Sequence, residues 1–368
     1  MTVYLIAIFL TMLVGYIGNQ HRYEVAAEEG SIKHYSWGAI YTLLILLIWC
    51  FVFTYRNIHV GTDGPSYYRI YSGIRNAGYS FSQYVTIRRD YLFSAVEYLC
   101  SKVSGGNWFF YQFTVSLLIY WPIIHVAKRY SYDTQMSLLL FIFTFRFFNG
   151  YNGMRQEIAA SIVALAYYDF LLDRKYFKSV VLLAIAFGFH SSTLIAIPFL
   201  FLSTRDLHSK AVKWTGFGLF VFYLVIWQIW PLIIRLLSVM GQAKMAADYA
   251  EVSQDKGSGF LRFVVAILPF LIGYMYRERL RQEHDELFDH ELVMCLFSGL
   301  FMLLSIRYWI FARVAEFFVV GQIMLVPKLK SVFRGQGKVA ILLLYFAYMI
   351  ALLLHGDGHY YPYSFFWS

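Results

Sequence analysis

Long apolar runs are the feature of this sequence that most restricts its fold. A helix rises about 1.5 Å per residue, so a run of about 20 residues can cross a hydrocarbon layer of about 30 Å. The sequence has twelve such runs or near-runs, at 2–18, 38–55, 108–126, 135–149, 155–172, 177–189, 192–203, 214–234, 260–276, 291–306, 312–327 and 339–355. The sequence therefore predicts an all-α, polytopic integral membrane protein with about twelve transmembrane helices.

The composition excludes several other classes of protein. Of the 368 residues, 59% are hydrophobic and only 14% are charged, which is too apolar for a water-soluble or disordered chain. The apolar runs are continuous, whereas the strands of a transmembrane barrel alternate apolar and polar residues. Three cysteines do not form a disulfide framework. Because no repeat or linker divides the chain, we expect one helical membrane domain over 1–368.

Basic residues predict how the helices are oriented. The net charge is +9, and loops rich in Lys and Arg belong in the cytoplasm. This rule places these loops inside: 19–37, 127–134, 173–176, 204–213, 277–290 and 328–338. Both outer flanks of the stretch 177–203 are basic, so it is expected to form a hairpin with His190 and Ser191 at its outer tip. The termini and the long loop 56–107 then lie outside.

The loop 56–107 is expected to contain two helices lying along the membrane surface. Pro65 can open the first helix and Gly78 can close it, with Tyr67 on its apolar face. A second periodic set of residues follows at Leu92, Phe93, Val96, Leu99, Cys100 and Val103. The loop is therefore predicted to be folded.

Polar side chains gather at the outer level of the predicted bundle. A charge near hydrocarbon costs a few kcal/mol, so such a group is a functional candidate by default. Many of the outer basic residues are Arg, which suits bidentate binding of phosphate or carboxylate. The candidates are Arg56, His59, Asp63, Tyr67, Arg146, Arg155, Gln156, His190, Arg307 and Arg313. We expect them to share one cavity.

Three of these positions have two interpretations each. In the turn GYNGMRQ (150–156), Arg155 at a helix start could bind phosphate, or it could merely extend to the membrane interface. Asp63 could cap a helix or act as a general base. His190 could satisfy a backbone carbonyl or take part in catalysis. No P-loop, serine-hydrolase motif or metal-ligand spacing is present, so neither a cofactor nor a metal is predicted.

Four blocks of the sequence resemble the EpsG family, which is related to Wzy-type polysaccharide polymerases. The likeness covers most of 1–205 and continues more loosely through Arg313 and the terminal YYPY. The four blocks are Arg56, Gly61, Asp63 and Tyr67; NGMRQEIA (152–159); DRKYFK (173–178); and FHSSTLIAIP (189–198). Their order and spacing agree with the family.

The resemblance implies an enzyme of the bacterial cytoplasmic membrane that joins oligosaccharide repeat units at the outer face. The growing chain would leave its undecaprenyl pyrophosphate for a sugar hydroxyl of the next lipid-linked unit. Arg155, with Arg313 or Arg56, would bind the pyrophosphate, and Asp63 or His190 would be the base. Membrane lipid is a partner, chain-length regulators and export proteins could be others, and nucleic acid is not expected.

The chain departs from the family pattern at one place. A Glu-Pro-Gly-like turn is expected before the second loop helix, but Arg89, Asp90 and Tyr91 stand there; Asp90 could substitute in this turn, and its role is left open. Two other functions stay open. A lipid-linked oligosaccharide flippase would line a passage through the bilayer with polar residues, and a membrane acyltransferase would use a histidine with a cytoplasmic acyl donor. The scarcity of charges at mid-helix depth favours the polymerase.

Overall fold

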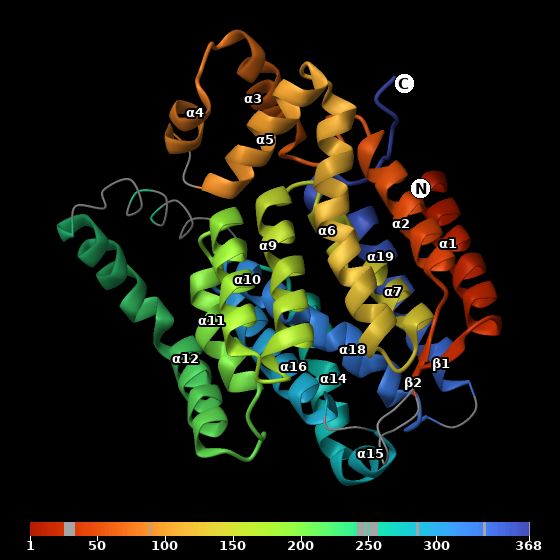
Figure 1. Ribbon diagram of the computed structural model, residues 1–368. Helices are drawn as coiled ribbons and strands as arrows, with labels where there is room; N and C mark the ends of the chain where they lie inside the picture. Colours follow the sequence, from red (N-terminus) through yellow and green to blue (C-terminus); the bar gives the residue numbers. More distant parts are fainter. Residues whose placement is uncertain are drawn as a thin grey trace. The chain divides into compact units, whose positions relative to one another are not determined.

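In the described part of the chain, the regular elements are helices and one short β-ribbon (Figure 1). The computed structural model describes residues 1–25, 34–87, 90–240, 247, 250, 257–284, 287–333 and 336–367. They form two compact units, one of Met1–Leu194 with Lys330–Ser368 and one of Ile195–Leu329. All residues of the long loop 56–107 that are described belong to the first unit.

The first unit is a layer of helices that run between its two ends (Figure 1). α6 packs against α2 on one side and α9 on the other, while α1 packs against α2 and α7. A π-helical turn, Tyr167–Leu171, continues α9. The helices are α1 (Thr2–Gln20), α2 (Ala39–Thr54), α6 (Trp108–Tyr130), α7 (Thr134–Phe143), α8 (Arg146–Asn149), α9 (Met154–Ala166), α10 (Tyr176–Phe189) and α19 (Gly337–His355).

Aromatic side chains fill the interior of this unit. Trp49 of α2 stacks on Phe141 of α7 with ring centroids 5.3 Å apart, and it meets Tyr120 of α6 edge-on at 5.5 Å. Tyr120 in turn stacks on Phe147 of α8 at 5.1 Å. All four rings are buried. Because such pairs add to the burial of apolar area, much of the aromatic content serves helix packing.

The long loop forms three helices beyond one end of α6 (Figure 1). They are α3 (Gly64–Asn76), α4 (Phe81–Ile87) and α5 (Tyr91–Ser104). The two predicted loop helices correspond to α3 and α5, whereas α4 was not predicted because seven residues are too few for a clear periodic pattern. α3 buries Tyr71, which stacks on Tyr111 of α6 at 4.4 Å. The loop is thereby packed onto the helix layer.

The opposite end of the first unit carries the β-ribbon between α1 and α2 (Figure 1). β1 (Tyr23–Val25) pairs antiparallel with β2 (His34–Ser36), and Tyr23 lies opposite Ser36. The sequence predicted no strand in the loop 19–37. Strands of three residues are too short to show the alternation by which a strand is recognised.

Asp133 joins three segments at this same end. Its Oδ1 accepts a hydrogen bond from the backbone N–H of Met136 at 3.1 Å and so caps α7. Its Oδ2 binds the ammonium groups of Lys330 at 3.0 Å and Lys338 at 2.8 Å. Burial alone would raise the pKa of Asp133, but the two lysines outweigh it and hold the pKa below its ordinary value. The carboxylate therefore ties α7 to the start of α19.

Replacing Asp133 with asparagine should keep the helix cap but remove the charge that both lysines bind. We expect the apparent melting temperature in detergent to fall by roughly 2–5 °C, because hydrogen bonds between charged groups are lost. A carboxylate whose pKa is lowered by folding stabilises the folded protein at pH values above its ordinary pKa. The difference in melting temperature between the wild-type protein and Asp133→Asn should therefore be constant from about pH 8 to about pH 5 and shrink below about pH 4. Asp173→Asn, which removes an exposed pair with Lys175, should change little.

The second unit is built around α16. This helix packs against α12, α14, α17 and α18, and most of its residues are buried. A short 3₁₀ turn, Glu316–Phe318, joins α17 to α18. The helices are α11 (Thr193–Ser203), α12 (Lys210–Val239), α14 (Phe260–Met275), α15 (Arg277–Glu283), α16 (Leu287–Ser305), α17 (Ile310–Ala315) and α18 (Val319–Leu329).

Six candidate membrane spans are long and apolar enough to cross a bilayer, and the bent pair α14 and α15 would add a seventh. The six are Thr2–Gln20, Trp108–Tyr130, Lys210–Val239, Leu287–Ser305, Ile310–Leu329 and Gly337–His355. Each predicted run contains a described helix, but α2, α7, α10 and α11 have only 10–17 residues. At about 1.5 Å per residue these helices fall short of about 30 Å. The protein is thus an all-helical, multi-pass membrane protein with six or seven candidate spans, and twelve full-length spans are not seen among the described residues.

Candidate functional site

Asp90 is the residue at which distant parts of the first unit meet. It precedes α5, but its side chain makes no hydrogen bond that caps this helix. Instead, its Oδ2 accepts a hydrogen bond from Nη1 of Arg155 at 2.6 Å, and its Oδ1 lies 3.7 Å from Nδ1 of His190. The residue is 5% exposed. One buried carboxylate therefore brings the start of α9 and the end of α10 to the long loop.

Arg155 is positioned by the helix that it begins. It is the second residue of α9, where the unpaired N–H groups of the first turn give a partial positive charge. A guanidinium has five N–H donors, and the hydrogen bond to Asp90 uses only one of them. Since the side chain is 43% exposed, Arg155 can bind Asp90 and still reach a phosphate.

His190 ends α10 and turns its ring towards Asp90. Its Nδ1 is buried and has no hydrogen-bond partner among the described residues, since the separation of 3.7 Å from Asp90 is longer than a hydrogen bond. A carboxylate facing Nδ1 favours the tautomer that carries its proton there, which leaves Nε2 as a hydrogen-bond acceptor.

The electrostatics of the cluster fix the charge of Asp90. Burial by itself would raise the pKa of Asp90, but the neighbouring His190 and Arg155 stabilise the charged form and lower the pKa below its ordinary value. Tyr67 of α3 lies beside Arg155, and burial raises the pKa of its phenol although the guanidinium partly offsets this. At neutral pH the site therefore holds an ionised Asp90 and a neutral Tyr67 that can donate a hydrogen bond.

Asp63 lies one turn before Tyr67, at the start of α3. Its carboxylate makes no capping hydrogen bond, so that interpretation of the sequence is not the one observed. Oδ1 of Asp63 accepts a hydrogen bond from the hydroxyl of Thr62 at 3.2 Å. Its backbone N–H donates to Oδ1 of Asn152 at 3.3 Å, which joins this loop to the turn that precedes Arg155.

Asn152, the first residue of the NGMRQEIA block, organises the surroundings of the site, a role that was not predicted for it. Its side-chain N–H groups donate to the carbonyl of Gly358 at 3.0 Å and to the hydroxyl of Tyr360 at 3.1 Å. Gly61 has φ +104°, and a Cβ on it would stand 2.5 Å from Oδ1 of Asn152. These contacts hold three segments together at one end of the unit: the loop 56–107, the turn before α9 and the carboxyl-terminal segment.

Arg56 lies outside the Asp90 cluster. It is 3% exposed, its guanidinium lies 4.0 Å from the ring centroid of Phe53 and 4.5 Å from that of Tyr151, and it donates to the carbonyl of Phe53. A backbone bridge pairs Arg56 with Phe365 of the carboxyl-terminal segment. Among the described carboxylates none is within ion-pair distance of it. Arg56 is thus enclosed by aromatic rings and by the end of the chain.

Arg146 and Gln156 are also buried within the first unit. Arg146 binds Glu157 with both arms of its guanidinium, Nη1 to Oε1 at 3.1 Å and Nη2 to Oε2 at 2.8 Å. The two side chains are only 4% and 3% exposed, and Gln156 is 7% exposed. The pair fixes the first turn of α9, on which Arg155 stands.

The Arg146→Ala variant is expected to fold poorly, because it leaves Glu157 buried without this partner at a cost of about 3–5 kcal/mol. The double variant Arg146→Met/Glu157→Leu should recover most of the folded protein, since apolar replacements of similar size avoid a buried charge. Fluorescence-detected size exclusion measures the folded amount of each variant. If the double variant were folded but inactive, Arg146 would be a substrate ligand instead of a support for α9.

The remaining predicted arginines belong to the second unit. Arg307 lies over the rings of Tyr223 at 5.1 Å and Trp227 at 5.0 Å, and Arg313 lies over Trp309 at 4.6 Å. Their convergence with the Asp90 cluster stays a prediction. Arg89, next to Asp90 in the sequence, lies outside the described residues.

Comparison with known proteins gives a family match. The sequence model of the EpsG family matches residues 39–365, which include Asp90, Arg155 and His190. The resemblance noted in the four sequence blocks is therefore confirmed over most of the chain. No curated protein and no solved structure matches it.

Proposed function

This chain belongs to the EpsG family, and from that premise we propose that it is a polysaccharide polymerase acting on oligosaccharide repeat units carried by undecaprenyl pyrophosphate. Family membership links the chain to polysaccharide biosynthesis, and its candidate spans make it a multi-pass membrane protein. The observation that carries the proposal further is the cluster of Arg155, Asp90 and His190. It combines a partly exposed cation with a histidine set against a carboxylate.

The proposal places this cluster at the outer face of a bacterial cytoplasmic membrane, with about twelve crossings in all. In the first unit, the loop 56–107 and the cluster lie at one end of the helices, and the Lys330–Asp133–Lys338 contacts lie at the other. The positive-inside rule puts that basic end in the cytoplasm. Short helices such as α2 and α10 would complete crossings together with their flanking residues.

The reaction requires the protein to stabilise negative charge on the leaving pyrophosphate and to position the acceptor hydroxyl. A new bond forms between the acceptor hydroxyl oxygen and the anomeric carbon of the donor, and the bond from that carbon to the pyrophosphate oxygen breaks. The electron pair leaves on the pyrophosphate, where Arg155 and the start of α9 stabilise the charge. His190 takes the hydroxyl proton through Nε2 and returns it to solvent, while Asp90 holds the ring and the guanidinium in place.

The geometry favours His190 over Asp63 as the base. His190 faces a buried carboxylate that stabilises the protonated ring during the reaction, whereas Asp63 accepts a hydrogen bond from Thr62. Tyr67 would donate to the pyrophosphate or a sugar oxygen beside Arg155. Arg307 and Arg313 remain proposed ligands of the pyrophosphate, while Arg56, Arg146 and Gln156 would support the site from within the protein.

Purified protein in proteoliposomes, supplied with defined undecaprenyl-pyrophosphate-linked repeat units, tests the function. A polymerase yields a ladder of longer glycans and releases undecaprenyl pyrophosphate. Movement of intact lipid-linked units across the bilayer without elongation would instead indicate a flippase. Incorporation of label from an acyl donor into the glycan, without a ladder, would indicate an acyltransferase.

A further inference from the structure

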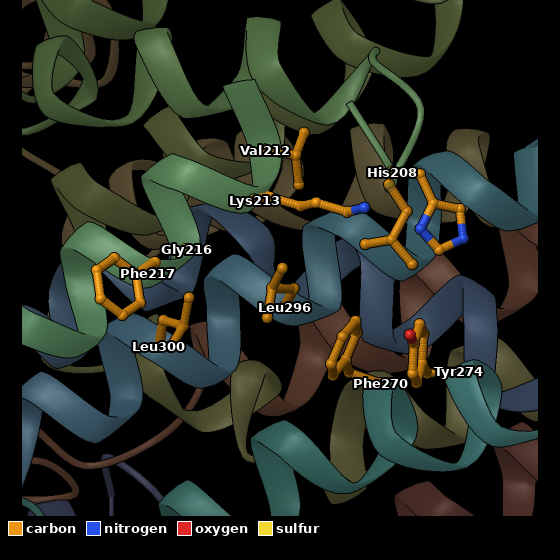
Figure 2. Close-up of a pocket in the computed structure, with 10 residues that line it drawn as sticks. His208, Val212, Lys213, Gly216, Phe217, Phe270, Tyr274, Leu296 and Leu300 are labelled. Atoms are coloured by element: carbon orange, nitrogen blue, oxygen red, sulfur yellow. The ribbon is translucent and has the colours of Figure 1, made fainter. Parts of the chain in front are cut away.

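A groove in the second unit opens between α12, α14 and α16 (Figure 2). Its volume is about 270 Å³, at the low end of small-molecule pockets, which suits part of a chain-like ligand. The walls are mostly apolar, with Phe217, Phe270, Leu296 and Leu300 among them. Gly216 forms part of the α12 side: a Cβ there would be 3.7 Å from Leu300 and 3.8 Å from Leu296.

The groove is polar at one end only. Figure 2 shows the ammonium of Lys213, the ring of His208 and the hydroxyl of Tyr274 towards one end, and Phe217 with Leu300 towards the other. The chain order agrees, because His208 comes just before α12, Lys213 lies in its first turn ahead of Phe217, and Tyr274 stands in the last turn of α14. A ligand lying in the groove would need a polar head and an apolar tail.

Lys213 is the one charged residue among the described residues that line the groove. Asp206 is the acidic group nearest in sequence, and it accepts a hydrogen bond from the backbone N–H of His208 and pairs with Arg277 at 3.4 Å. Arg277 also binds Asp289 at 2.8 Å. The ammonium of Lys213 is therefore the charge that the head of a ligand would meet first.

One wall of the groove belongs to α12, a helix that is largely exposed. α12 is a candidate span of which only 11% of the apolar window is buried, and Phe217 and Leu224 are 58% and 54% exposed. Such a helix lies against lipid acyl chains. The groove is therefore open on the side from which a lipid would enter.

We propose that this groove is a binding site for an anionic glycerophospholipid, with the phosphate at Lys213 and His208 and one acyl chain along Leu296 and Leu300. The ammonium of Lys213 at one end of the groove and the apolar side chains at the other favour a ligand with an anionic head and an apolar tail. The flanking segment 204–213 is basic and belongs inside by the positive-inside rule, which faces the anionic leaflet. A lipid-linked repeat unit polymerised outside would present its pyrophosphate to the other face.

Native mass spectrometry of the purified full-length protein tests this site with an equimolar mixture of phosphatidylglycerol and phosphatidylcholine of identical chains. The wild-type protein should retain phosphatidylglycerol with about a fivefold preference, the size expected of one lysine at a membrane surface. Lys213→Gln should abolish the preference and Lys213→Arg should keep it. Lys210→Gln, which removes an exposed lysine that does not line the groove, is the matched control and should also keep it.

Filling the groove gives a second, independent readout. Gly216→Leu should abolish retention of both lipids, whereas Gly218→Leu should not, since a side chain at Gly218 meets open space. The proposal is overturned if the wild-type protein shows no preference, if Lys210→Gln acts like Lys213→Gln, or if Gly218→Leu acts like Gly216→Leu. Displacement of phosphatidylglycerol by a lower concentration of undecaprenyl phosphate would also overturn it, by assigning the groove to the polyprenyl carrier.

Discussion

The Arg155→Ala variant is expected to form polymer about 100- to 1,000-fold more slowly than the wild-type protein, which is the usual loss when one donor to a developing negative charge is removed. Arg155 combines a buried hydrogen bond to Asp90 with a side chain that is 43% exposed. Because the Arg155 side chain is 43% exposed, water can take its place beside Asp90, so we expect a smaller loss of folded protein than for Arg146→Ala. Rates are therefore compared at equal amounts of folded protein.

Two further variants make this result specific. Arg155→Lys should recover only part of the rate, because an ammonium is a single point charge and cannot bind Asp90 and phosphate with a planar fork. Arg69→Ala removes an exposed arginine of α3, the helix that also carries Tyr67, and should leave the rate unchanged. Initial rates of ladder formation at equal protein amounts decide the comparison. Normal polymerisation by Arg155→Ala would remove Arg155 from the mechanism.

The His190→Gln variant is expected to lose about 100- to 10,000-fold in rate, the range that general bases contribute. Asp90→Asn should lose a comparable factor, because it releases both His190 and Arg155 from the carboxylate that holds them. The double variant should be little worse than either single variant, since residues that act as one unit give non-additive losses. Asp63→Asn is expected to have a much smaller effect.

Single-turnover rates over a range of pH separate these roles. Because the pKa of Asp90 is already below its ordinary value, the wild-type carboxylate stays charged, and the loss in Asp90→Asn should be the same factor from about pH 5 to about pH 8. If Asp63→Asn lost more than His190→Gln at every pH, the base would be Asp63. Additive losses in the Asp90 and His190 double variant would show that the two residues act separately.

Hydropathy was sufficient to predict where the helices lie but not how far they extend as straight spans. Each apolar run contains a described helix. Backbone N–H and C=O groups need hydrogen bonds both in the protein interior and in lipid, and a helix supplies them in either place. The breaks depend on local backbone geometry instead. Phe145, with φ +73°, separates α7 from α8, and nothing in its apolar surroundings indicates a left-handed residue.

The candidate site was predicted in part. Arg155, His190 and Tyr67 were singled out by charge and by the family blocks, and the structure brings them to one place. No firm role was assigned to Asp90, because the residues around it depart from the turn that the family resemblance leads us to expect there. Its partners are 65 and 100 residues away in the chain, and no local pattern reveals contacts over such separations.

Burial was the other property that sequence could not supply. Arg56, Arg146 and Arg155 are the same residue type at the same predicted level, yet the first two are 3% exposed and engaged inside the unit, whereas the Arg155 side chain is 43% exposed. An arginine paired within the protein and one that can reach a ligand differ only in their three-dimensional neighbours. Of these three arginines we therefore propose only Arg155 as a ligand of the pyrophosphate.

A structure of the full-length protein with undecaprenyl pyrophosphate bound would test the proposed site most directly. Our account predicts that the diphosphate contacts the guanidinium of Arg155 at the start of α9, with His190 and Asp90 beside the open position for the acceptor sugar. A diphosphate bound elsewhere, with Arg155 still engaged only by Asp90, would contradict it.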